Sequence, residues 1–354
     1  MIFRIICRNK FILLRDNVYI MATIKDVAKV AGVSIATVSR VINQGEKVNQ
    51  KTRDKVRTVM QQLGYRPNAN AQALVTQKSK TLGVVIPELT DPFFALLASG
   101  VEAIAKEMGL QLLLSTGTGS AESELDALNI LLDRRCEAIV MHSKHISDQK
   151  LQQLLGQNPG LVLIDRYIPE VQERCIWLDN IEGGRIAARH LLSLGHKCFA
   201  CISSEYDIED PQLRLQGFVE TLNEQGISKG TVAVSMATPN QQGGQSATQE
   251  LLATGQPFTA LFAYNDAMAS GAISTLEDNG IRVPEDVSII GFDDVILASF
   301  TRPKLTTLKY PVEEMAAQAA QLALMHLDGE VTTMQTEMKH LPSLIRRASC
   351  ARLR

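Results

Sequence analysis

The chain has 354 residues, of which 45% are hydrophobic and 21% charged. This length suits two or three globular domains, the composition excludes a disordered chain, and no apolar run approaches the roughly 18–20 residues of a membrane-spanning helix. The net charge of −2 is unevenly spread, because the first 80 residues hold fifteen Lys and Arg against four Asp and Glu. A basic amino-terminal part followed by an acidic remainder is expected of a nucleic-acid-binding domain joined to another domain.

Residues 1–20 mix basic and apolar side chains. The charges interrupt the apolar stretch and no small-residue cleavage site follows, so a secretory signal fits poorly. We interpret this segment as an extension without a fixed fold, with an amphipathic membrane anchor as the alternative, because Met21 opens a pattern that is complete in itself.

The six cysteines include one CxxC pair, Cys198 and Cys201. This pair falls in a predicted strand, where residues three apart face opposite sides. Reduced thiols of a cytoplasmic protein are therefore expected rather than a redox or metal site.

Residues 23–43 predict two short helices joined by a glycine turn. Ile24, Val27, Ala28 and Ala31 share one helical face, with Thr23 as the cap. Gly32 ends this helix, and Ser34 caps a second helix that runs from Ile35 to about Ile42. Such a pair is a helix-turn-helix.

The second helix turns Val38, Val41 and Ile42 inward and presents small side chains outward. In this motif the second helix lies in the major groove of DNA. The hydroxyls of Ser34, Thr37 and Ser39 can bind phosphates, and Arg40 can donate two hydrogen bonds to guanine. An ordinary helical corner has a similar pattern and remains the alternative.

A third helix is predicted to start at Thr52 and to end at Gly64, with Val56, Val59, Met60 and Leu63 on its apolar face. The segment Tyr65–Lys80 follows. Its "ANAQALV" supplies one or two helical turns, too few to be stable alone in water. We interpret it as a hinge helix that needs a partner to order it, with a plain linker as the alternative.

From Leu82 onward, short apolar runs alternate with amphipathic helical stretches, which predicts an α/β fold with parallel sheets covered on both faces. About twelve elements make two sheets. Polar residues just past strand ends gather in one crevice in such folds. The candidates are Asp91, His142, Asp165, Asn265, Asp266, Asp293 and Asp294. Without a nucleophile–base pair, a metal cluster or a phosphate loop, they suit a polyol and predict neither catalysis nor a cofactor.

Several stretches together resemble the lactose-repressor family of bacterial regulators, and within it the galactose-responsive ones. They are "TIKDVAKVAGVSIATVSRVIN", "GYRPNANAQAL", "DPFF", "YNDAMASGA" and "VSIIGFDDV", followed by "RPKLTTLKYP". The resemblance covers Met21 to about Ser349. It implies a helix-turn-helix head (21–66), a hinge helix and linker (67–80) and a periplasmic-binding-protein-like core (81–354) whose chain crosses between two subdomains near 180, 310 and 339.

The resemblance also assigns roles to residues of the head and hinge. Ile35, Ala36 and Arg40 would read bases, and Thr23, Ser34, Thr37, Ser39 and Asn43 would hold phosphates. In the hinge, Asn68, Ala71 and Leu74 would contact DNA, with Leu74 as a wedge between base steps in the minor groove.

In the core, the resemblance implies that a sugar lies between the subdomains, against Asp91, Phe93, Asp165, Arg214, Asn265, Asp293 and Tyr310. Asp165 departs from the galactose regulators, in which Asn is expected. Phe262 and Trp177 are the candidates for one further aromatic contact.

The function that follows is that of a cytoplasmic, homodimeric repressor of genes for galactose transport and metabolism, released from operator DNA by D-galactose. A regulator of the same family that responds to another sugar or to a nucleoside is the alternative. A periplasmic sugar-binding protein would share the fold of the core, but the basic head argues against it, and no residue pattern indicates an enzyme.

Overall fold

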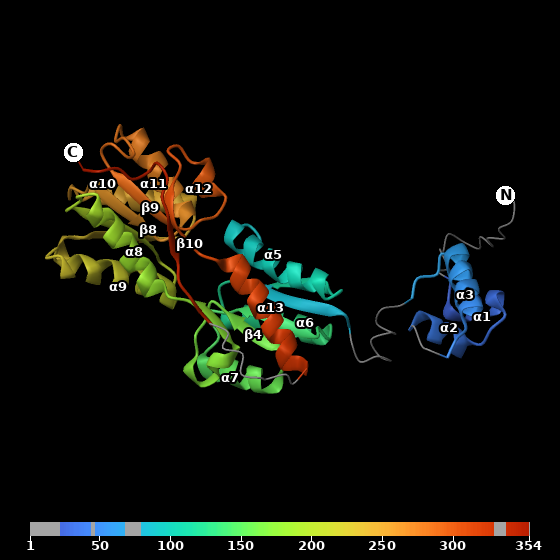
Figure 1. The fold of residues 1–354 in the computed structure, drawn as a ribbon. Coiled ribbons are helices and arrows are strands. Elements are labelled where there is room, and N and C mark those ends of the chain that lie inside the picture. Colours follow the sequence, from blue (N-terminus) through green and yellow to red (C-terminus); the bar gives the residue numbers. More distant parts are fainter. Residues whose placement is uncertain (1–21, 44–46, 68–78, 329–337, 354) are drawn as a thin grey trace, which may run out of the picture. The chain divides into compact units, whose positions relative to one another are not determined.

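The computed structural model describes residues 22–43, 47–67, 79–328 and 338–353 (Figure 1). The chain divides into two compact units, residues 1–79 and 80–354. The predictions for residues 1–20 and for Asn68, Ala71 and Leu74 lie outside the described residues.

The first unit contains the three predicted helices, α1 (Ile24–Ala31), α2 (Ile35–Ile42) and α3 (Gln50–Leu63). Thr23 and Asp26 form a reciprocal capping box at the start of α1, and Gly32 ends α1 with a φ of 63°. Glycine adopts this left-handed conformation at no steric cost, and it lets the chain turn directly into Ser34, the cap of α2. The helix-turn-helix prediction is therefore confirmed.

One apolar cluster holds the three helices together. Val27, Val38 and Val56 are fully buried at its centre. The predicted start of α3 was wrong by two residues: the helix begins at Gln50, because the side chain of Asn49 accepts a hydrogen bond from the backbone N–H of Thr52 and caps the helix earlier.

The second unit is α/β and contains two six-stranded sheets, as predicted. The first sheet is entirely parallel, in the order β11-β5-β4-β3-β1-β2. Its strands are β1 (Thr81–Ile86), β2 (Gln111–Thr116), β3 (Ala138–His142), β4 (Leu161–Ile164), β5 (Cys175–Leu178) and β11 (Lys339–His340). Its helices are α5 (Pro92–Glu107), α6 (Ala121–Asp133), α7 (Asp148–Gln157) and α13 (Val312–Asp328), with a 3-10 turn at Pro169–Arg174. We call these elements the first half.

The second sheet has the order β12-β10-β9-β8-β6-β7, and only β12 runs antiparallel to its neighbour. Its strands are β6 (Phe199–Ser204), β7 (Ala233–Ala237), β8 (Ala260–Ala263), β9 (Ser288–Asp293), β10 (Thr306–Lys309) and β12 (Ser343–Ile345). Its helices are α8 (Asn180–Ser193), α9 (Glu209–Glu224), α10 (Gln241–Ala253), α11 (Asp266–Asp278) and α12 (Leu297–Phe300), with a 3-10 turn at Lys229–Thr231. We call these elements the second half.

The chain passes between the halves three times: from β5 to α8, from β10 to α13, and from β11 to β12. Each half is thus assembled from separate stretches of sequence. Helix α13 follows a strand of the second half, but it packs on α5 and on strands β3, β4 and β5 of the first half.

Candidate functional site

The outward face of α2 carries the residues that the sequence analysis assigned to DNA. Ile35 is 45% exposed, and Ala36 and Arg40 are also exposed, so this face is open to a groove. Thr37, Ser39 and Asn43 are half-buried beside it. The exposed aliphatic Ile35 is not needed by the core of this unit, which suits a contact with base edges.

The predicted phosphate contacts also stabilise the helix ends. The Ser34 hydroxyl oxygen accepts from the backbone N–H of Thr37 at 3.1 Å and lies 2.8 Å from the Thr37 hydroxyl. The Thr23 hydroxyl donates to Asp26 at 2.7 Å. Each hydroxyl keeps a helix start in place, so replacing it will affect both folding and any phosphate contact.

The second unit contains a cavity of about 650 Å³ lined by both halves, a size typical of small-molecule sites. Its lining includes Asp91, Phe93, Asp165, Arg214, Asn265 and Asp293, six of the seven residues predicted to contact a sugar. They lie here because the carboxyl ends of the strands in both sheets meet at this cavity. We call it the cleft.

Backbone conformation directs two of these carboxylates. Asp165 follows β4 with a φ of 59°, and Asp293 ends β9 with a φ of 102°. Non-glycine residues rarely adopt positive φ, although aspartate tolerates it better than most. Asp91 and Asn265 are helix caps, for α5 and α11, and each uses one side-chain oxygen to accept a backbone N–H.

Tyr310, the seventh predicted residue, is buried below the cleft and does not line it. Its hydroxyl donates to one Asp165 oxygen at 2.5 Å, while its ring packs edge-on against Phe93 with ring centroids 4.9 Å apart. Tyr310 therefore positions Asp165 and Phe93.

Other strand-end and aromatic residues do not lie where we predicted. Asp266 is fully buried and accepts from the Thr307 hydroxyl and the Val295 backbone N–H, while Asp294 pairs with Arg347 at 2.6 Å. Phe262 lies in the core beside Phe218, and Trp177 contacts Tyr167. The aromatic residues that line the cleft from the second half are Tyr206 and Tyr264.

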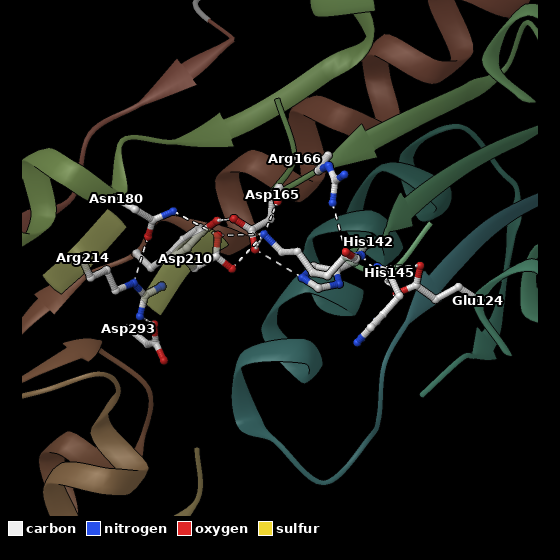
Figure 2. A network of polar contacts seen from close by, with 11 residues as sticks. Glu124, His142, His145, Asp165, Arg166, Asn180, Asp210, Arg214 and Asp293 are labelled. Carbon is white, nitrogen blue, oxygen red and sulfur yellow. Dashed lines mark hydrogen bonds and ion pairs between the residues drawn. The ribbon is translucent and has the colours of Figure 1, made fainter. Parts of the chain in front are cut away.

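A cation and a carboxylate that line the cleft, Lys144 and Asp210, were not predicted from the sequence. The Lys144 ammonium lies 2.9 Å from Asp165 and 2.8 Å from Asp210, and all three side chains are at most 8% exposed. Figure 2 shows Asp165 and Asp210 within one network of polar contacts. Lys144 lies two residues past β3, and Asp210 lies in the first turn of α9, a helix that the sequence analysis did not identify.

Burial and neighbouring charges act against each other on this group. Burial alone would raise the pKa of Asp165, but the Lys144 ammonium and the hydrogen bonds from His142 and Tyr310 bring the pKa well below its ordinary range. Burial alone would lower the pKa of Lys144, but Asp165 and Asp210 raise it above its ordinary value. Both groups are therefore charged at neutral pH.

Arg214 is the second cation of the cleft and is held on every side. Its guanidinium lies over the rings of Phe292 and Tyr264, at 3.7 and 4.5 Å from their centroids. It donates to Asn180 at 2.9 Å and to the Tyr264 carbonyl oxygen at 2.7 Å, and it lies 3.6 Å from Asp293.

The pKa of the Asp293 carboxyl group is raised. Burial, together with the nearby charges of Asp91, Asp165 and Asp210, raises its pKa to about 7, although Arg214 lowers it. An unfolded aspartate has a pKa of about 3.9. Between these two values the folded protein retains a proton that the unfolded chain has lost, so this group destabilises the fold as the pH rises from about 4 to 7.

Replacing Asp293 with asparagine removes that pH-dependent cost. We expect the melting temperature of Asp293→Asn, relative to that of the parent, to rise steadily between pH 5 and pH 7.5 and then to level off, as followed by circular dichroism. The control is Asp278→Asn, which removes a carboxyl group from an exposed position at the end of α11, outside the cleft. A difference for Asp293→Asn that stays flat across this pH range would contradict the raised pKa.

None of the helices in the described part of the chain combines the length and the apolar character needed to cross a lipid bilayer.

Comparisons with known proteins match both units of the chain to known families. Residues 23–68 match the family described as bacterial regulatory proteins, lacI family, and residues 188–350 match a periplasmic binding protein-like domain. The chain is 45% identical to the HTH-type transcriptional regulator GalS of Salmonella typhimurium over 333 residues, which are 94% of this chain and 97% of that protein. It is also 45% identical to GalR of Escherichia coli over 329 residues, 93% of this chain and 96% of that one.

Solved structures agree with these matches. The lac repressor dimer bound to operator and the anti-inducer ONPF aligns with a TM-score of 0.83 and 28% identity, over 93% of this chain and 99% of that one. A complex of the transcriptional regulator CelR with cellobiose aligns with a TM-score of 0.67 and 31% identity, over 93% of this chain and 99% of that one.

Proposed function

Because the chain belongs to the lacI family of bacterial regulatory proteins, we propose that this DNA-binding regulator represses genes of galactose transport and metabolism and leaves its operator when D-galactose binds in the cleft. The observation that carries the proposal is the presence in one chain of an exposed helix-turn-helix face and a cleft lined by carboxylates, an amide and a guanidinium. The motifs quoted above that resemble the galactose-responsive regulators support the choice of sugar.

In this proposal two copies of the chain bind one operator, with one α2 in each half-site. Ile35, Ala36 and Arg40 read bases, and Thr23, Ser34, Thr37, Ser39 and Asn43 hold phosphates. The sugar lies between the halves against Asp91, Phe93, Asp165, Arg214, Asn265 and Asp293. Its binding favours a closed arrangement of the halves that no longer suits the operator.

The chemistry of the cleft suits a neutral, hydroxyl-rich ligand. Its lining holds seven carboxyl side chains, those of Glu88, Asp91, Glu124, Asp165, Asp207, Asp210 and Asp293, but only Lys144 and Arg214 as permanent cations. A phosphorylated sugar would bring its own negative charge into this surrounding, whereas sugar hydroxyls can donate to the carboxylates and accept from the guanidinium.

Operator binding with and without sugar tests the proposal. A fluorescent operator duplex should bind the protein and be released by D-galactose, while a panel of monosaccharides and nucleosides in a thermal-shift assay identifies the effector. A ligand at 100 times its dissociation constant should stabilise the fold by about 2.7 kcal/mol. If another sugar or a nucleoside stabilises the protein and millimolar galactose does not, galactose is not the effector. The panel includes these other ligands because Asp165 stands where an asparagine is expected in galactose regulators.

Arg40 offers a test of DNA recognition. We expect Arg40→Ala to weaken specific operator binding by about 1–3 kcal/mol, because a bidentate contact with guanine is lost, and to relax the base preference at one position. Thr37→Ala should weaken all sequences alike, since a phosphate contact carries no sequence information. The measurement is fluorescence anisotropy with operators substituted at each base pair. If Arg40→Ala has the same base preference as the parent protein, Arg40 does not read a base.

A further inference from the structure

The side chain of Lys144 connects the two halves of the second unit. Lys144 belongs to the first half, in the loop that follows β3, whereas Asp210 belongs to the second half, in the first turn of α9. The ammonium lies 2.9 Å from one Asp210 oxygen and 2.8 Å from the other. On its own side it contacts both the carboxylate and the backbone carbonyl oxygen of Asp165.

The loop that carries Lys144 is held in place from both sides. The buried carboxylate of Glu124 accepts from the backbone N–H of Lys144, His145 and Ile146 and from the Ser143 hydroxyl. On the opposite side, Arg166 donates to the carbonyl oxygen of Lys144 at 3.1 Å and pairs with Asp148. The backbone of Lys144 is therefore held in place while its ammonium group contacts Asp210.

Asp210 is fixed in turn from the second half. It is 6% exposed, and the Asn180 amide donates to it at 3.4 Å. The oxygen of the same amide accepts from Arg214 at 2.9 Å. Asn180 is the first residue of α8, directly after the first crossing between the halves. Figure 2 shows the resulting chain of contacts, from the loop after β3 through Asp210 and Asn180 to Arg214.

An ammonium group has three hydrogen-bond donors, and the Asp165 carboxylate, the Asp165 carbonyl and the Asp210 carboxylate account for all three. The bridge across the cleft is complete without any sugar hydroxyl. Removing one partner of a buried pair leaves the other charge uncompensated, so the contact favours the arrangement in which the halves are close together.

We propose that the Lys144–Asp210 bridge is a latch that holds the two halves of the second unit closed before any sugar enters, and that it thereby sets the balance between closed and open forms in the free protein. The effect on DNA rests on the proposed function, in which the closed form is the one that leaves the operator. A ligand shifts such a balance only through its different affinities for the two forms. A latch that populates the closed form therefore lowers operator affinity and raises sugar affinity at the same time.

The conformational part of the proposal is tested without sugar or DNA. Spin labels are attached at Lys150→Cys in α7 and Asp278→Cys in α11, one exposed position in each half, in a chain carrying Cys7→Ser and Cys198→Ser. Labelled chain is diluted into excess unlabelled chain, and the distance between the labels is measured by pulsed electron resonance. Asp210→Asn, which keeps the shape of the side chain but removes its charge, should shift the distances to larger values.

Glu209→Gln is the matched control, because it removes the same charge from the neighbouring, exposed position of α9; its distances should equal those of the parent. Lys144→Met should open the halves as Asp210→Asn does. If Lys144→Met fails to fold because Asp165 and Asp210 lose their shared cation, the result for Asp210→Asn decides. Distances in Asp210→Asn that match those of the parent overturn the latch.

A second measurement separates a latch from a simple sugar contact. In the absence of sugar, Asp210→Asn should bind the operator on the order of 5-fold more tightly than the parent, the lower end of typical allosteric coupling, and it should need more galactose for release. A residue that only contacts sugar would leave sugar-free operator affinity unchanged, and that result also overturns the latch. If galactose fails to bind the parent while Asp210→Asn still opens the halves, the proposed ligand is wrong and the latch stands.

Discussion

Arg214→Ala is expected to abolish the response to galactose while operator binding persists. Each buried polar group left without its partner costs about 1–3 kcal/mol, and the Arg214 side chain lines the cleft, so the dissociation constant for galactose should rise at least about 100-fold. Titration calorimetry measures the sugar, and anisotropy with a labelled operator measures the release. Arg185→Ala, which removes a half-buried arginine of α8 that does not line the cleft, is the control and should respond like the parent.

Because the Arg214 side chain is closely packed, a second and milder substitution is needed alongside Arg214→Ala. The guanidinium packs on Phe292 and Tyr264 and holds Asn180, so alanine also leaves a void and unpaired groups, and a lower melting temperature should accompany the lost response. Arg214→Lys keeps the charge and most of the stem but loses the planar donor pair. It should remain folded and still respond poorly to galactose. If Arg214→Lys releases the operator at the same galactose concentration as the parent protein does, Arg214 has no role in sugar recognition.

Gly217→Ala is expected to destabilise the second unit and to impair the cleft, although this residue does not line the cleft. Helices α8 and α9 approach each other at two glycines: a Cβ on Gly217 would lie 1.9 Å from the Ile181 carbonyl oxygen, and one on Gly184 would lie 2.0 Å from that of Arg214. Overpacking usually costs about 1–3 kcal/mol. Here the obstacle is backbone, which cannot rotate away, so we expect the upper end of that range.

Moving α9 away from α8 would also move Arg214 and Asp210, which lie on α9. Gly217→Ala should therefore lose galactose affinity together with stability, as measured by urea unfolding and calorimetry. Gly156→Ala in α7 is the matched control, since no atom lies within 4 Å of its added Cβ. It should leave stability unchanged or raise it by up to about 1 kcal/mol. Equal stabilities of the two variants would contradict the close helix contact.

Much of the fold could be predicted because local signals agreed with the tertiary structure. Thr23, Gly32 and Ser34 delimit α1 and α2 through short-range hydrogen bonds that the sequence encodes directly. Alternating apolar runs likewise predicted two parallel sheets. The start of α3 was missed because Asn49 and Thr52 are both good caps, and a sequence pattern does not tell which one the chain uses.

Apart from the residues assigned by the family resemblance, the lining of the cleft was predictable only where a side chain lies at the end of a strand or just past it. Asp165, Asn265 and Asp293 were found in this way. Asp266 follows a strand equally closely, yet its carboxylate turns toward Thr307, a residue 41 positions away. Lys144 and Asp210, which are 66 positions apart in the sequence, become partners only when the two halves meet. No local pattern carries that information.

The three crossings between the halves have a consequence for how the protein is made. Domains generally fold as units during synthesis, the amino-terminal ones first, but the first half cannot do so here. Its helix α13 and its edge strand β11 are translated only after almost all of the second half. Met315, Ala316 and Ala319, which α13 buries completely, are missing from the nascent chain until then. Most of the second half, all but β12 and the residues after it, has thus been translated while an apolar surface of the first half is still uncovered. Chaperone dependence should be greatest for chains truncated between β10 and α13.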